Sequence, residues 1–293
     1  MRTALVTGTS TGIGLEIALK FAREGYRVYA GARRPEMVEK HANIIPVRLD
    51  VDNDESVRAC VAGVGPVDVL VNNAGIGIAG TVEMVPMEKI RAMFETNFFG
   101  AVRMIQAVLP GMRERRRGTV VNITSLMGRV TLGGHGYYAA TKYALTAVSE
   151  TLAAEVRSFG IRVAVIEPGV VLTPIWGKAE YAMPADHPYP QVMGRLERLF
   201  GTQLDGATMP DVVARATYEA VETGAAKLRY PVGADAEVAA ATRDRMTAAE
   251  WMELMTVEED AAFFAKAETA FGVDLYHPPS LNQRQARVST TSS

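Results

Sequence analysis

Cysteine is nearly absent from this chain of 293 residues, which contains only Cys60. A single thiol cannot form an internal disulfide, and this composition is typical of proteins in a reducing cytoplasm. Histidine is also scarce, and His41, His135, His187 and His277 do not have the spacing of metal ligands. The sequence therefore predicts neither a disulfide scaffold nor a metal site.

The chain also lacks a strong net charge and any long apolar run. Its formal net charge is −2, so we expect no overall electrostatic attraction to nucleic acid or to an anionic membrane. No segment reaches about 18 uncharged apolar residues, and the opening "MRTALVTG" is typical of a strand that enters a turn, not of a signal peptide. The basic run "RERRR" (113–117) is interpreted as a solvated helix end. We expect a cytoplasmic protein with no nucleic-acid partner and no membrane insertion.

Hydrophobic residues make up 48% of the chain, enough for a sizeable core. They form short β-branched runs that alternate with longer helical stretches. Strands are predicted at 3–8, 27–31, 44–50, 67–73, 119–124, 162–169 and 227–233. Helices are predicted at 12–24, 53–63, 86–115, 138–158 and 210–223. Because most strand runs are continuously apolar, the pattern predicts an α/β fold with a Rossmann-type, doubly wound parallel sheet of about seven strands and helices on both faces.

Two segments depart from this alternation. Residues 174–207 are too long for a simple loop and rich in aromatic and methionine side chains. We interpret them as a substrate lid over the carboxyl edge of the sheet, where such folds bind ligands; the alternative is a surface excursion that packs on its own aromatics. Residues 235–276 are predicted to form an extra C-terminal helical extension. Residues 281–293 are polar without periodicity and are predicted to be disordered, which leaves one domain over 1–280.

A glycine-rich stretch, "VTGTSTGIG" (6–14), joins the first predicted strand to the first helix. Gly8, Gly12 and Gly14 lack a Cβ, so backbone N–H groups and the helix N-terminus can approach a pyrophosphate. The position between an apolar strand and an amphipathic helix is the context that dinucleotide binding requires, although a plain turn is the alternative. The spacing Gly-x-x-x-Gly-x-Gly resembles the turn of the short-chain dehydrogenase/reductase family, in its compact single-domain branch with a Tyr-x-x-x-Lys active site.

This resemblance, which covers about residues 3–232, implies a set of cofactor contacts. Beyond the glycine turn they lie in "LDV" (49–51), "NNAG" (72–75) and "EPGVVLT" (167–173). The implied cofactor-binding residues are Gly8, Ser10, Thr11, Gly12, Ile13, Gly14, Asp50, Val51, Asn73, Ala74, Gly75, Tyr138, Lys142, Pro168, Gly169, Val171 and Thr173.

The end of the second predicted strand bears on the choice of cofactor. An NAD enzyme carries an acid here to bind the ribose 2′-hydroxyl, but this chain reads "GARRPE", with Ala32 followed by Arg33 and Arg34. A guanidinium can hold the 2′-phosphate of NADP with two hydrogen bonds. The alternative is a solvated charge pair. We predict NADP as the cofactor, with NADPH preferred and Arg33 as the main contact.

Two polar residues at other strand and helix positions are candidates for catalysis. Asn97 lies on the apolar stripe of the predicted helix 86–115, so its buried amide either braces a backbone or serves a site. "NFFG" resembles the family's Asn-x-x-Gly, which implies that Asn97 holds a water in a proton relay. Ser125 ends the fifth strand without the elbow sequence of a nucleophilic serine, and His135 has no evident orienting partner. The family implies instead that the Ser125 hydroxyl hydrogen-bonds the substrate carbonyl.

Three tyrosines lie near one lysine in "GYYAATKY" (136–143). Helix positions four apart share a face, so only Tyr138 lies one turn from Lys142. This pair reproduces the family's Tyr-x-x-x-Lys and implies that Tyr138 is the general acid/base. A charge about 4 Å away at an effective dielectric of about 20 supplies roughly 4 kcal/mol, enough to lower a tyrosine pKa by about 3 units. Tyr137 is assigned to the pocket wall and Tyr143 to packing.

The sequence thus predicts an NADP(H)-dependent oxidoreductase that interconverts a secondary alcohol and a ketone. The apolar lid favours a bulky apolar small molecule, bound by Ser125, Met127, Tyr138 and Trp176. Family members often assemble, which predicts a homodimer or homotetramer. One alternative is a non-catalytic NADP(H)-binding regulatory protein, against which the intact catalytic set argues. Redox-neutral halohydrin or epoxide chemistry is a further alternative, but it should lack the glycine turn and carry arginine in place of the lysine.

Overall fold

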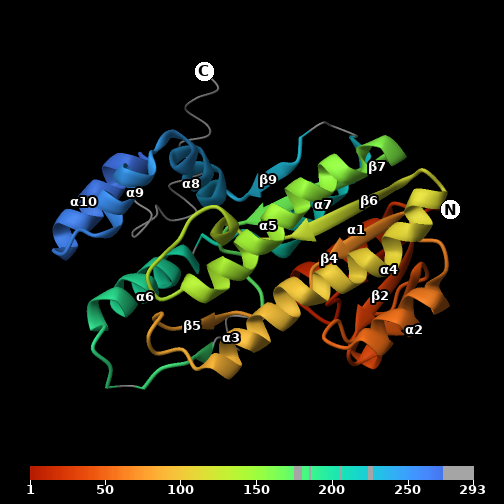
Figure 1. The fold of residues 1–293 in the computed structure, drawn as a ribbon, viewed down its shortest axis with the longest axis horizontal. Coiled ribbons are helices and arrows are strands. Elements are labelled where there is room, and N and C mark those ends of the chain that lie inside the picture. Colours follow the sequence, from red (N-terminus) through yellow and green to blue (C-terminus); the bar gives the residue numbers. More distant parts are fainter. Residues whose placement is uncertain (175–179, 185, 205, 224–226, 273–293) are drawn as a thin grey trace.

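The centre of the protein is a seven-stranded sheet in the order β3-β2-β1-β4-β6-β7-β9, in which every neighbouring pair is parallel (Figure 1). The computed structural model describes residues 1–174, 180–184, 186–204, 206–223 and 227–272. The strands are β1 (Thr3–Thr7), β2 (Arg27–Ala32), β3 (Ile44–Arg48), β4 (Val69–Asn72), β6 (Gly118–Ile123), β7 (Ile161–Pro168) and β9 (Arg229–Val232). The predicted α/β fold, with all seven predicted strands in one sheet, is confirmed.

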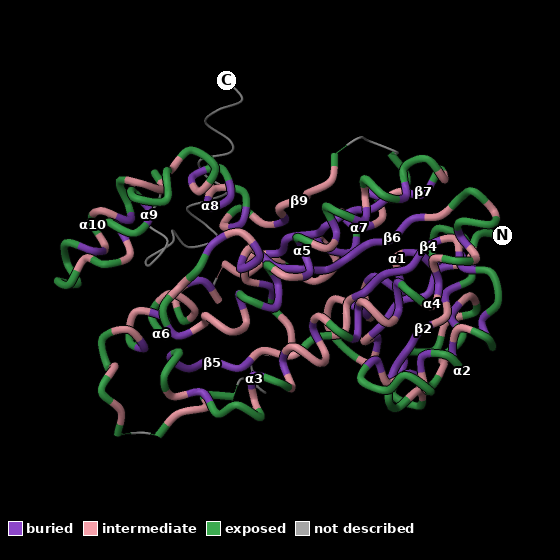
Figure 2. The backbone as a smooth tube through the Cα atoms, viewed as in Figure 1, coloured by how far each residue is buried: buried purple, intermediate pink, exposed green. Residues whose placement is uncertain are grey.

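Helices cover both faces of this sheet. Along β1, Ala4 and Val6 point into one apolar core and Leu5 into the other, as the two-residue period of a strand requires. The helices on the first face are α1 (Gly12–Arg23) and α7 (Pro210–Glu222). Those on the second face are α2 (Asp54–Val64), α4 (Gly100–Glu114) and α5 (Gly136–Val156). Figure 2 shows the strands buried between these layers.

The predicted helix 86–115 is present over residues 87–114, but it is not a regular α-helix throughout. The structure contains α3 (Met87–Phe94), a π-helical turn (Glu95–Phe99) and then α4. A π turn inserts an extra residue into the helix and often marks a functional site. Here the insertion lets the buried side chain of Asn97 reach the backbone that follows β4, which a regular helix register does not predict.

The segment predicted to be a lid is built from a short strand and a helix in its described part. β8 (Glu180–Tyr181) pairs in parallel with β5 (Ile78–Ala79), and α6 (Pro190–Leu204) follows. The pairing ties the lid to the segment that leaves the carboxyl end of β4. Met193 and Leu196 of α6 are buried, so α6 packs on the body of the protein.

The predicted C-terminal extension is helical and contains α8 (Ala234–Arg245), α9 (Ala248–Met255) and α10 (Asp260–Phe271). These helices lie at the same end of the molecule as α6, opposite the N-terminus (Figure 1). Leu254 and Phe263 are buried and share an apolar cluster with Leu199 of α6. The predicted disordered tail, 281–293, lies outside the described residues.

Candidate active site

The carboxyl ends of the strands form one edge of the sheet, and a groove of about 510 Å³ runs along it. Such an edge is where open parallel sheets bind their ligands. Most of the predicted cofactor residues line this groove. They are Gly8, Ser10, Thr11, Gly12, Ile13, Arg33, Arg34, Asp50, Val51, Asn73, Ala74, Gly75, Tyr138, Lys142 and Thr173.

The glycine turn is packed too tightly for side chains. A Cβ on Gly14 would lie 2.3 Å from the carbonyl oxygen of Gly8 and 2.4 Å from the Asn73 amide. Gly8 adopts φ 71° and Gly12 adopts φ 63°, in the left-handed region that favours glycine. The turn opens directly into α1, and no side chain caps the helix N-terminus at Thr11. Its first N–H groups are therefore available to an anionic group in the groove.

The residues after β4 hold this turn in place. The Asn73 side chain donates hydrogen bonds to the carbonyl oxygens of Thr7, at 2.9 Å, and Gly8, at 3.2 Å. The Thr7 hydroxyl accepts from the backbone N–H groups of Asn73 and Ala74. Asn73 and Ala74 therefore fix the shape of the groove as well as lining it.

Two arginines line the groove after β2. Arg33 and Arg34 are both exposed and both line the groove. The Asp52 carboxyl also lines the groove, and its pKa is raised, chiefly by burial. A hydrogen bond from Thr96 and the charge of Arg33 both lower this pKa and so offset part of the rise. An exposed guanidinium at this position can turn toward a phosphate without leaving a buried charge unpaired.

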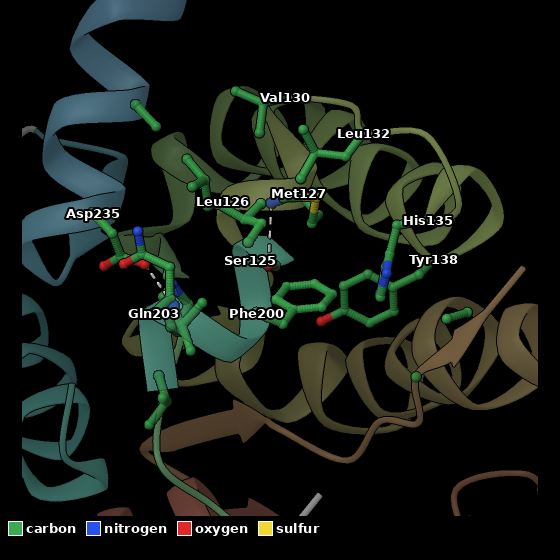
Figure 3. A pocket seen from close by; sticks show the side chains of 18 of the residues that line it. Ser125, Leu126, Met127, Val130, Leu132, His135, Tyr138, Phe200, Gln203 and Asp235 are labelled. Atoms are coloured by element: carbon green, nitrogen blue, oxygen red, sulfur yellow. Dashed lines mark hydrogen bonds between the residues drawn. The ribbon is translucent and has the colours of Figure 1, made fainter. Parts of the chain in front are cut away.

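A second cavity, of about 250 Å³, adjoins the groove and is mostly apolar (Figure 3). The predicted substrate residues Ser125, Met127 and Tyr138 line it, whereas the predicted Trp176 lies outside the described residues. The C-terminal extension closes the cavity through α9 and α10, with Trp251, Met255 and Phe271. Tyr138 lines both the groove and the cavity, so the two spaces meet at its side chain.

Three other predicted cofactor residues lie on the cavity side of this junction, and Gly14 lines neither space. Pro168, Gly169 and Val171 follow β7 and line the apolar cavity, not the groove. Thr173 lines both spaces, and its methyl group would lie 3.3 Å from a Cβ on Gly12. The loop after β7 therefore forms the wall between groove and cavity.

Ser125 begins a short 3-10 turn at the end of β6. Its hydroxyl oxygen accepts a hydrogen bond of 3.1 Å from the backbone N–H of Met127. The same hydroxyl hydrogen-bonds the Tyr138 side chain. Ser125 thus presents a fixed hydroxyl to the cavity beside the Tyr138 phenol, as the sequence interpretation requires.

Tyr138 and Lys142 lie one helical turn apart on α5, with the lysine Nζ 5.7 Å from the centre of the tyrosine ring. Burial raises the pKa of Tyr138, and the Ser125 hydrogen bond opposes this rise. Burial also lowers the pKa of Lys142 to about 8. The expectation that Lys142 lowers the pKa of Tyr138 is therefore not what the structure shows. Desolvation is the largest cause of both pKa shifts.

The other two tyrosines are turned to other partners. The Tyr137 hydroxyl donates a hydrogen bond of 2.9 Å to the carbonyl oxygen of Val82. The Tyr143 hydroxyl donates to the carbonyl oxygen of Arg129. Neither residue lines the groove or the apolar cavity, so the helical register separates Tyr138 from its neighbours as predicted. The assignment of Tyr137 to the pocket wall is wrong, because its hydroxyl is turned to the Val82 carbonyl.

Asn97 is 1% exposed and fully hydrogen-bonded. Its Oδ1 accepts from the backbone N–H of Ile76 at 2.8 Å, and its Nδ2 donates to the Ile76 carbonyl at 2.9 Å. Nδ2 also donates to the Thr141 hydroxyl, which in turn donates to the Tyr138 carbonyl. Asn97 therefore braces the backbone after β4 against the turn of α5 that carries Tyr138, and the sequence interpretation missed Thr141 in this chain of contacts.

The sequence interpretation also missed several residues that reach the cavity from distant segments. His135 precedes α5, Phe200 and Gln203 belong to α6, and Asp235 lies in the first turn of α8. Figure 3 shows His135 and Phe200 beside the Tyr138 ring. Only His135 carried a sequence signal, its position three residues before Tyr138. The others come to the site through tertiary packing alone.

The described residues contain neither a metal-binding cluster nor a membrane-spanning helix. Among these residues, no three side chains of histidine, cysteine, aspartate or glutamate are grouped so as to hold a metal ion. No helix in the same part of the chain has the length and apolarity needed to cross a membrane.

The sheet, the glycine turn and the Tyr138–Lys142 pair at its edge place the chain in a known class of oxidoreductases. The family model described as short chain dehydrogenase matches residues 2–183. The chain belongs to the short-chain dehydrogenase/reductase family, and the suspected family is confirmed.

Individual relatives support the same assignment. The chain is 43% identical to human retinol dehydrogenase 8 over 190 residues, which cover 60% of this chain and 61% of that protein. A short-chain dehydrogenase structure from Streptomyces avermitilis matches with a TM-score of 0.78 and 36% identity, over 86% of this chain and 95% of that one. A Burkholderia cenocepacia short chain dehydrogenase in complex with NADP matches with a TM-score of 0.73 and 25% identity, over 88% and 100% of the two chains.

Proposed function

We propose that this oxidoreductase uses NADP(H) to interconvert a secondary alcohol and a ketone on a bulky apolar small molecule. The observation that carries the proposal is that two spaces adjoin, with Tyr138 among the residues that line both. A groove with a glycine turn and a largely apolar cavity share Tyr138. A cofactor in the first and a substrate in the second would bring their reacting ends together beside one phenol.

The groove offers hydrogen-bond donors and positive charges that suit the phosphate groups of NADP. The uncapped N-terminus of α1 suits the pyrophosphate, and Arg33 and Arg34 suit the 2′-phosphate. Lys142 Nζ lies beside Gly75, 3.6 Å from the position of a Cβ there, where it would hold the nicotinamide ribose. When bound, NADP(H) supplies or accepts the hydride.

The protein's own residues then position the carbonyl and handle its proton. The Ser125 hydroxyl hydrogen-bonds the carbonyl oxygen, and Tyr138 gives its phenol proton to that oxygen during reduction. A raised pKa keeps Tyr138 protonated at neutral pH, which is the state a proton donor needs. Asn97 and Thr141 hold the turn of α5 that carries Tyr138 in register. Water near Asn97 then returns a proton to the Tyr138 phenol.

The substrate proposal rests on the cavity and on the lid. Leu126, Met127, Val130, Leu132 and Phe200 make most of its wall apolar. The human relative is named a retinol dehydrogenase, which supports an apolar substrate, although the matched segment spans 61% of that protein. We place residues 174–207 as the lid, with Trp176 at the substrate, in a single domain over 1–280.

Assembly into a homodimer or homotetramer stays a prediction, as does a cytoplasmic location. Two exposed aromatic side chains support an assembly through the long helices. Phe99, just before α4, is 46% exposed, and Tyr143 on α5 is 38% exposed. Sedimentation measurements on the purified chain test this directly.

A panel of apolar ketones and alcohols, including steroid, retinoid and aryl compounds, tests the function when run separately with NADPH and NADH. We expect turnover with a preference for NADPH. Arg33→Ser should raise the KM for NADPH by about tenfold or more without changing the KM for NADH, because a charge-assisted contact is worth about 1.5–3 kcal/mol.

Arg34→Ser is the matched control, with a smaller expected effect. A preference for NADH would contradict the assignment of Arg33. Absence of turnover across the whole panel would favour the regulatory alternative.

A further inference from the structure

His135 lies at the catalytic end of the apolar cavity. Its ring meets the Tyr138 ring edge-on, with centroids 5.0 Å apart and planes at 89°. It meets the Phe200 ring in the same manner, at 5.4 Å and 76°. His135 lines the cavity together with these two residues (Figure 3). In one bound molecule, an atom hydrogen-bonded to the His135 imidazole would therefore be only a few covalent bonds away from the atom hydrogen-bonded to the Tyr138 hydroxyl.

The imidazole has a hydrogen-bonding capacity that the protein does not use. Its Nδ1 atom is buried and has no hydrogen-bond partner among the described residues. A buried nitrogen without a hydrogen-bond partner destabilises the folded state. Phenylalanine would make the same edge-on ring contacts without this cost, so packing alone does not account for a histidine here.

The ring is neutral under ordinary conditions. Burial lowers the pKa of His135 to about 4. A neutral imidazole carries one N–H donor and one acceptor nitrogen, so it can pair with a hydroxyl or a carbonyl group. The nearby walls offer Leu132, Met127 and Val130, which have no strong hydrogen-bonding side chain to compete for this partner.

We propose that His135 binds a second oxygen of the substrate, so that the substrate class is an apolar ketone with a hydroxyl or carbonyl group a few bonds from the reacting carbon. The inference rests on the proposed function, because Tyr138 and Ser125 place the reacting carbonyl. His135 is a specificity-determining residue in this arrangement, since it carries no proton to or from the reacting carbonyl.

Two aryl ketones of one skeleton test the inference, propiophenone and 2-hydroxypropiophenone. The quantity measured is the ratio of their kcat/KM values with NADPH. We expect the wild-type protein to favour the hydroxyketone by about tenfold, the factor that one hydrogen bond of about 1.4 kcal/mol supplies. His135→Phe should bring the ratio close to one, and His135→Gln, which keeps a donor and an acceptor, should restore part of the preference.

His41→Phe is the matched control, because His41 lies before β3 and its Nδ1 accepts a hydrogen bond from the backbone of Asn43. Its ratio should equal that of the wild type. A wild-type ratio near one would overturn the inference. So would a His135→Phe variant that loses activity on both ketones while keeping the ratio, since that pattern indicates a structural role.

Failure of the proposed function would show separately, as no turnover of either ketone by the wild type. Binding then decides the role of His135. With NADP⁺ present, 2-hydroxypropiophenone should raise the unfolding temperature of the wild type more than propiophenone does, and His135→Phe should abolish the difference. Equal shifts for the two ketones in the wild type would overturn the inference.

Discussion

The carboxylate of Asp235 accepts a hydrogen bond of 2.7 Å from the backbone N–H of Val170. It fills the space beside Gly169, where a Cβ would lie 2.1 Å from Oδ2, and beside Gly233, where a Cβ would lie 2.7 Å from Oδ1. The first turn of α8 is thereby docked on the loop that separates groove from cavity. The C-terminal extension lies beyond the segment that the family model matches, and through Asp235 it fixes the loop after β7, which forms one wall of the candidate active site.

Asp235→Ala is expected to loosen this loop. Loss of a charge-assisted hydrogen bond should lower the free energy of unfolding by about 1.5–3 kcal/mol. The KM for NADPH should rise as well, because Thr173 in the same loop lines the groove. Asp235→Asn keeps one acceptor oxygen and should lose less. Denaturant unfolding and steady-state kinetics measure the two effects; unchanged values in both would show that the contact contributes nothing.

Gly169→Ala is expected to be destabilising because its new methyl group would meet the Asp235 carboxylate. The same change in an Asp235→Ala background should cost less, by about 1 kcal/mol or more, since residues in contact are not additive. Unfolding free energies of the two single variants and the double variant form the cycle. Strict additivity would mean that the backbone at Gly169, not Asp235, sets the need for glycine.

Tyr138→Phe is expected to lower kcat by a factor of about 100 or more, because it removes the proposed proton donor. Tyr137→Phe is the matched control. It removes only the hydrogen bond to the Val82 carbonyl, and its kcat should stay within about threefold of the wild type. Steady-state rates on the same ketone compare the two. Equal losses would contradict the assignment by helical register.

Lys142→Met is expected to abolish turnover while making the protein more stable at neutral pH. The buried ammonium has its pKa lowered from 10.5 to about 8, which corresponds to roughly 3 kcal/mol of destabilisation of the charged form. Loss of its 3.2 Å hydrogen bond to the Ile123 carbonyl offsets part of this gain, so a net rise of about 1–2 kcal/mol is expected.

The pH dependence gives a second measurement for Lys142. The folded state releases the lysine proton near pH 8 and the unfolded state near pH 10.5, so wild-type stability should rise between these values. The Met variant should lack this rise. A variant that is less stable than the wild type at pH 7 would contradict the burial argument.

His135 is expected to weaken the fold in mild acid. Its folded pKa of about 4 lies below the ordinary value of 6.5, so the unfolded state binds the proton first as pH falls. Wild-type stability should therefore decline from about pH 6.5 to pH 4, and His135→Phe should remove roughly 3 kcal/mol of that decline. Unfolding curves of both proteins across this range test it; parallel declines would show that the imidazole has the same pKa in the folded and unfolded states.

The sequence by itself predicted the sheet well, because a buried parallel strand must be apolar on both faces and leaves a continuous apolar run such as residues 163–166. Local rules also separated Tyr138 from Tyr137, since the pitch of a helix is fixed by its own backbone. These local rules did not predict the π turn that contains Asn97. The Asn97 amide in this turn hydrogen-bonds the backbone of Ile76, a residue distant in sequence, and a periodic pattern does not show such a contact.

The cavity was decided by tertiary structure. Phe200, Asp235 and Trp251 come from three different helices, and the order of these helices along the chain does not predict that they line one cavity. Which face of each helix is buried depends on the neighbouring elements that pack against it. The electrostatics of Tyr138 and Lys142 were decided in the same way, since desolvation depends on everything packed around a charge. Sequence motifs set which groups are present at the sheet edge, and the long-range packing sets their burial, their pKa values and the shape of the space they face.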